Sequence, residues 1–110
     1  MKFINNPFEI LTEVIQENFP HIDCDIHIGE QMTDGKETFG CTLFPDDEKE
    51  RIVIELHTSL SLKDATEILA HELAHVIAGK DAGHKGDWVS AFDDIHFMFH
   101  QKLEEKYTKK

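Results

Sequence analysis

Basic residues are scarce in this sequence. The 110 residues include 11 lysines and arginines against 22 aspartates and glutamates, which leaves a formal net charge of −11. A chain of this charge repels the phosphate backbone of nucleic acids, so we expect no autonomous nucleic-acid binding. The one dense basic run, residues 106–110, lies at the C-terminal end of the sequence, where we expect it to be solvated.

Long apolar segments are absent as well. No stretch approaches the roughly 20 apolar residues that a membrane-spanning helix needs, so we expect no membrane association. Residues 1–7 also lack the apolar centre of a signal peptide. A cytoplasmic location is therefore expected.

Only two cysteines are present, Cys24 and Cys41, and they lack the paired spacing of a zinc ribbon. A reducing cytoplasm keeps such thiols free. Each cysteine falls within an alternating apolar pattern, so we expect both side chains to pack on the covered face of a sheet.

The length and the ordinary share of apolar residues indicate one folded domain over residues 1–110. Residues 8–19 carry apolar side chains at helical spacing, and Pro20 ends that segment. Three later segments alternate apolar and polar residues with the period of a strand: 22–28, 39–43 and 51–57.

A capped helix is predicted over residues 61–78. Ser61 and Asp64 have the spacing of a capping box, and Gly79 suits the left-handed position that follows many helices. Most faces of this segment are apolar, so it should lie centrally against the sheet. A last helix starts near Asp87. The sequence thus predicts an α+β domain with an N-terminal helix, a three-stranded mainly antiparallel sheet, a central helix and a C-terminal helix.

The predicted central helix contains the motif His71-Glu72-Leu73-Ala74-His75. Histidines four residues apart on a helix project from one face with Cβ atoms roughly 5–6 Å apart, so both imidazoles can hold one metal ion. Glu72 lies beside that pair, where its carboxylate can hold and deprotonate a metal-bound water. The spacing predicts two metal ligands and a general base on one rigid element.

A catalytic zinc site normally has three protein ligands and a water, so a further side chain is needed. We favour His84, because Gly79 ends the helix and Gly83 lets the chain turn back toward it. Asp81 is the alternative. It lies six residues after His75, as in the metzincin pattern, but the glycine of that pattern is replaced by Ala78.

The motif and the segment Gly83-His84-Lys85-Gly86-Asp87-Trp88 together resemble the SprT-like zinc metallopeptidases. In that family a His-Gly-x-x-Trp/Phe element follows the active helix. The resemblance implies that His84 is the third zinc ligand and that Trp88 packs behind the site in a minimal gluzincin-like, zincin-like domain. Lys85 stands where the family usually has glycine. The likeness covers roughly the second half of the chain.

These observations predict a zinc metallopeptidase, a hydrolase that binds Zn²⁺ through His71, His75 and His84. Glu72 activates the water, and the substrate is a protein or peptide that can pair with an exposed sheet edge. The alternative is a non-catalytic zinc-stabilised protein-interaction module. Glu72 favours the enzyme, because a structural zinc site has no need of a carboxylate beside its ligands.

Overall fold

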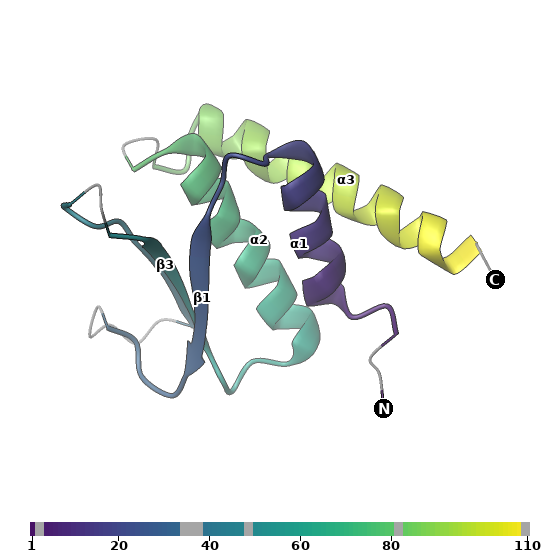
Figure 1. The fold of residues 1–110 in the computed structure, drawn as a ribbon, viewed down its shortest axis with the longest axis horizontal. Helices are drawn as coiled ribbons and strands as arrows, with labels where there is room; N and C mark the ends of the chain where they lie inside the picture. The colour runs from purple at the N-terminus through teal and green to yellow at the C-terminus, as the bar shows by residue number, and fades with distance from the viewer. Residues whose placement is uncertain (2–3, 34–38, 48–49, 81–82, 109–110) are drawn as a thin grey trace.

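The computed structural model of this chain describes residues 1, 4–33, 39–47, 50–80 and 83–108 (Figure 1). In these residues three helices and three strands follow one another: α1 (Pro7–Asn18), β1 (Cys24–Gly29), β2 (Gly40–Leu43), β3 (Ile52–His57), α2 (Leu62–Ala78) and α3 (Asp87–Thr108). The predicted α+β class is confirmed, and each predicted helix and strand overlaps one of these elements.

The sheet is mixed, with the strand order β1-β3-β2. The central strand β3 is parallel to β1, where Ile26 lies opposite Ile54, and antiparallel to β2, where Thr42 lies opposite Ile54. The predicted mainly antiparallel sheet is therefore wrong for the β1–β3 pair. Alternation along a strand marks its two faces but carries no information about the direction of its neighbour. Because β3 is central, β1 and β2 are the edge strands.

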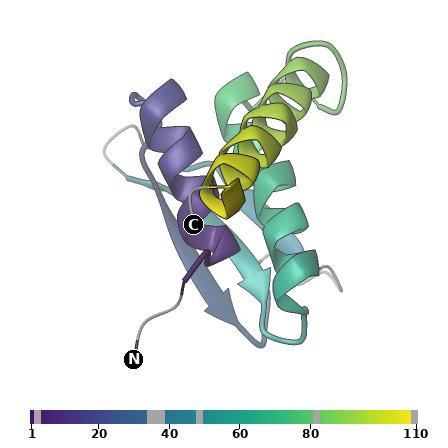
Figure 2. The same cartoon turned by 90° about the vertical axis from the view of Figure 1, so that its right-hand side faces the viewer.

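The three helices lie on one side of the sheet, and α3 crosses α1 and α2 on the side away from the sheet (Figure 2). Helix α2 packs against β2 and β3, and α1 and α3 pack against α2 and against each other. Ile54 of β3, Leu69 and Ala74 of α2, and Ile95 of α3 are all fully or almost fully buried in this core. The central position predicted for the motif helix is thus confirmed.

The face that β2 turns toward the helices differs from the expected one. Thr42 is opposite Ile54, whose side chain is fully buried beneath the helices, whereas Cys41 is opposite Glu55 on the other face. The Cys41 thiol donates a hydrogen bond to Glu55 Oε1 at 3.3 Å. The expectation that both cysteines pack on the covered face is therefore right for Cys24, which packs against the core, and wrong for Cys41.

Both ends of α2 are capped at the predicted residues, Ser61 and Gly79. Ser61 Oγ accepts a hydrogen bond from the backbone N–H of Asp64 at 3.1 Å, which satisfies one free donor of the first turn. Gly79 ends the helix with φ of +98°, and its N–H donates to His75 O at 2.9 Å. In the part of the chain that the structure describes, no helix is long and apolar enough to cross a membrane.

Candidate metal centre

Three histidine side chains converge where α2 meets the connector to α3. His71 and His75 lie one turn apart on α2, and His84 lies in the connector. Their Nε2 atoms are 3.3 Å apart for His71 and His75, 3.0 Å for His75 and His84, and 3.1 Å for His71 and His84. The three predicted ligands are thus brought together, close enough to hold a metal ion.

The spacing of the three nitrogens fits a shared cation. Two nitrogens bound at 2.0–2.1 Å to a tetrahedral zinc ion are about 3.3–3.4 Å apart, slightly more than the observed 3.0–3.3 Å. A linear N–H···N hydrogen bond satisfies only one pair of these atoms. One cation, in contrast, accepts the lone pairs of all three.

The surroundings of His71 and His75 keep these two rings neutral. Burial, together with the neighbouring His71 and His84 rings, lowers the pKa of His75 to about 4. Burial also lowers the pKa of His71, against an opposing effect of the Glu72 carboxylate. Neutral imidazoles have the free lone pair that a metal requires, so these two ligands are ready for metal binding at neutral pH.

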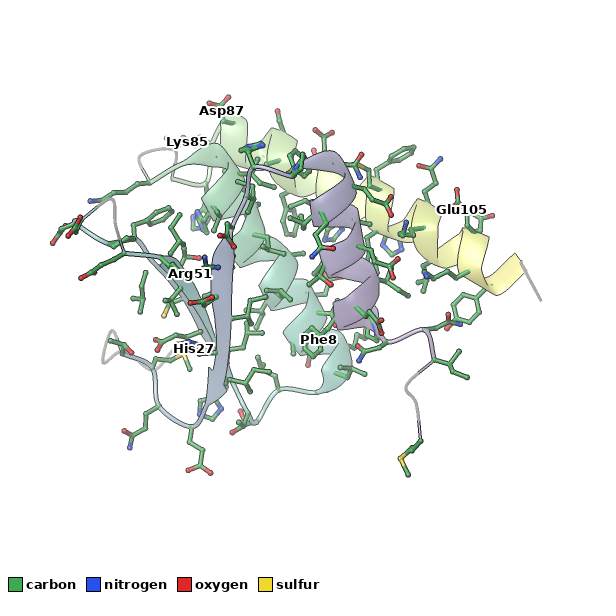
Figure 3. All side chains as sticks on the ribbon, in the orientation of Figure 1. Phe8, His27, Arg51, Lys85, Asp87 and Glu105 are labelled. Atoms are coloured by element: carbon green, nitrogen blue, oxygen red, sulfur yellow. The ribbon has the colours of Figure 1, made fainter. Side chains whose placement is uncertain are left out.

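His84 reaches the helix because the connector turns back through glycine. Gly83 has φ of +61°, a backbone conformation that residues with a Cβ rarely adopt. Lys85 and Asp87, labelled in Figure 3, mark the same turn at the end of the molecule where α2 ends. The expected return of the chain at Gly83 is thus confirmed. The alternative ligand Asp81 lies outside the described residues.

Glu72 is the only buried charged residue among the described ones, with 7% of its surface exposed. Its Oε2 lies 4.0 Å from His71 Nε2, on the side of the histidine cluster. Its Oε1 accepts a hydrogen bond from Thr42 Oγ1 at 2.8 Å. One carboxylate oxygen is therefore held by β2, while the other is next to the ligands.

Sequence reasoning missed Thr42. The residue lies in the middle of β2, 30 positions before Glu72, and its side chain is on the face that α2 covers. A polar residue on the covered face of a strand is the signal that identifies such a partner. The signal is masked in this strand because the apolar residues Phe39, Cys41 and Leu43 alternate with Gly40 and Thr42, which predicts the opposite face as the covered one.

Trp88 forms one wall of the cluster. Its ring centroid is 4.9 Å from those of His71 and His84 and 5.6 Å from that of His75. Its indole N–H donates to the backbone carbonyl of His71 at 3.2 Å, and Phe92 stacks on its ring at 4.9 Å. These contacts hold the imidazoles in place and link α3 to the ligand-bearing turn of α2.

The remaining histidines are not part of this cluster. His96 of α3 faces Glu67 of α2, with its Nε2 atom 3.2 Å from Glu67 Oε2. Within the described ranges, no second group of three or more His, Cys, Asp or Glu side chains has ligand atoms close enough to hold a metal ion.

Comparison with known proteins adds no assignment. The chain matches no protein-family model, no curated protein and no solved structure. Membership of the SprT-like family therefore stays a prediction that rests on the motif residues themselves.

Proposed function

We propose that this chain is a zinc-dependent metallopeptidase similar to the SprT-like enzymes, with a zincin-like arrangement around the motif helix α2. The observation that carries the proposal is the Glu72 carboxylate, whose Oε2 is 4.0 Å from His71 Nε2 beside three converging imidazoles. A structural zinc site has no use for a base at that position and usually closes its fourth place with Cys or His. Among the described residues no fourth such side chain joins the cluster.

Zinc is the metal that suits this donor set. Three neutral imidazoles with a place left for water are typical ligands of catalytic zinc, whereas magnesium and calcium prefer oxygen ligands. When bound, zinc polarises a peptide carbonyl and lowers the pKa of a water molecule toward about 7.

Glu72 is the general base in this proposal. Its Oε2 accepts a proton from the attacking water, and the same oxygen later delivers that proton to the leaving amine. The hydrogen bond from Thr42 to Oε1 keeps the carboxylate from rotating away from the ligands. His71, His75 and His84 bind the metal as neutral rings, and Trp88 shields one side of them from water.

The substrate in this proposal is an extended peptide. Strand β2 is an edge strand, and its residue Thr42 contacts the catalytic carboxylate directly. An edge strand offers unpaired backbone N–H and C=O groups that an extended peptide can pair with. A peptide bound along β2 therefore passes the metal centre.

The test compares the zinc-loaded wild type with Glu72→Gln on an unfolded protein such as reduced casein. Glutamine has the shape of glutamate but cannot take the proton, so we expect equal zinc content and a loss of cleavage of at least about 100-fold. His21→Ala, a change of an exposed histidine, is the control and should retain both properties. Cleavage by Glu72→Gln at the wild-type rate would contradict the proposal, and equal zinc binding without cleavage by either protein would favour the interaction module.

A further inference from the structure

An open hollow lies between the start of β2 and the first turns of α2, on the N-terminal side of the proposed centre along α2. It has a volume of about 480 Å³, within the range of roughly 300–1,000 Å³ typical of ligand sites. Phe39, Leu60 and Ile68 supply its apolar lining, and Asp64 and Glu67 add two carboxylates. Phe39 is 56% exposed, an unusual state for a phenylalanine, and β2 packs against α2 on this side of the sheet.

The hollow and the metal ligands share one stripe of α2. Asp64, Ile68, His71 and His75 follow one another at intervals of four, three and four residues, which places them on one helix face. At a rise of about 1.5 Å per residue, Ile68 lies only about 4.5 Å from His71 along the helix axis. The C-terminal edge of the hollow, at Ile68, thus lies about one helical turn from the first metal ligand.

Strand β2 runs from the hollow to the Glu72 carboxylate. Gly40 packs directly on the Ile68 side chain, since a Cβ at Gly40 would lie only 2.4 Å from Ile68 Cγ2. Two residues further along, Thr42 contacts Glu72. From Thr42 back to Phe39 an extended chain spans about 10 Å.

We infer that this hollow binds an apolar side chain of the peptide substrate, two or three residues from the bond that is cleaved. The inference rests on the proposed function. A peptide extended along β2 follows the strand from Thr42 to Phe39, and its side chains at alternate positions turn toward α2. The apolar surface of Phe39, Leu60 and Ile68 suits Leu, Ile, Met or Phe at that point.

The charges of the hollow add a second preference. The carboxylates of Asp64 and Glu67 belong to its lining, and only Glu67 has a described ion-pair contact, with His96 at 3.2 Å. They attract a basic residue of the peptide next to the apolar one and repel an acidic one. The net charge of −11 acts in the same direction. The substrate class is therefore an unfolded segment that carries an apolar residue beside a basic one.

The experiment uses the zinc-loaded full chain and unstructured peptides that differ at one position, occupied by Leu, Ala, Asn or Asp. We expect the wild type to prefer Leu over Asn by at least about tenfold in kcat/KM. Phe39→Ala should remove most of this preference. Phe97→Ala is the matched control, because Phe97 is a similarly exposed phenylalanine on α3, and it should leave the preference unchanged. Glu67→Gln should raise the relative rate for the Asp peptide.

The ratio of rates between peptides separates this inference from the proposed function. If the peptides are cleaved without a preference for Leu, or if Phe39→Ala leaves that preference intact, the hollow is not a substrate-binding site. The proposed peptidase function is retained in both cases. If no peptide is cleaved, affinities of the same peptides for the chain are measured by fluorescence anisotropy. Tighter binding of the Leu peptide that Phe39→Ala abolishes then supports the hollow alone, and no binding or no preference overturns it.

Discussion

At the scale of single residues, the hydrogen bond between Thr42 and Glu72 determines how the carboxylate is presented. Glu72 is almost fully buried, and a buried carboxylate needs hydrogen-bond donors to offset the loss of water. Thr42 Oγ1 provides one donor to Oε1 at 2.8 Å and leaves Oε2 beside His71. The orientation of the proposed base therefore depends on a residue of the sheet.

Replacing Thr42 with valine tests this dependence. Valine keeps the shape of threonine but cannot donate, so we expect kcat to fall by about tenfold with little change in KM or in zinc content. Thr42→Ser retains the hydroxyl and should restore most of the activity. The role of Thr42 would be refuted if valine and serine had the same effect on kcat, measured with one peptide at saturating concentrations.

The residues of the site differ in how far the sequence predicts them. His71, Glu72 and His75 belong to one helical turn and the next, so their spacing alone places them together. His84 could be predicted because Gly79 and Gly83 mark where the helix ends and the chain returns. Thr42 could not, because its contact with Glu72 depends on which face of β2 meets the helix. That choice is made by tertiary packing, 30 residues away in the chain.

At the scale of elements, the contact of β2 with α2 joins the sheet to the motif helix. Gly40 and Thr42 face α2, and the absent side chain of Gly40 allows Ile68 to approach the strand backbone. The packing of these two elements brings Thr42 to Glu72. A small residue at position 40 is therefore a condition for the site.

Gly40→Ala is expected to destabilise the fold by about 1–3 kcal/mol, because the new Cβ would lie 2.4 Å from Ile68 Cγ2, and a β-branched side chain in a helix strongly prefers one χ1 rotamer. In an Ile68→Ala background the same change should cost much less. Gly29→Ala is the control, since a Cβ there meets nothing within 4 Å. Urea unfolding of the wild type, the two single variants and the double variant gives the coupling free energy between positions 40 and 68. If Gly40→Ala lowered the free energy of unfolding equally in both backgrounds, the described packing would be disproved.

The elements themselves were mostly predictable, and their pairing was not. Alternation and caps indicated all three helices and three strands because both are local properties. The parallel pairing of β1 with β3 results from the insertion of β3 between two earlier strands, which no local pattern records. In β2 both alternate sets contain small or apolar residues over only four positions, so alternation could not tell which face is covered.

At the scale of the whole molecule, the candidate centre is assembled from both the sheet and the helices. Two ligands come from α2, the third from the connector, the wall from α3 and the partner of Glu72 from β2. A bound metal stabilises the folded state because the ligands converge only there. Metal binding at this centre is therefore expected to raise the free energy of unfolding.

The most direct test of this account is X-ray absorption at the zinc edge on protein loaded with one equivalent of zinc, for the wild type and for His84→Ala. We predict nitrogen and oxygen ligands at about 2.0–2.1 Å with outer-shell scattering from three imidazoles in the wild type. Scattering from two imidazoles is predicted in His84→Ala. A sulfur ligand, or spectra that do not change when His84 is removed, would contradict the centre formed by His71, His75 and His84.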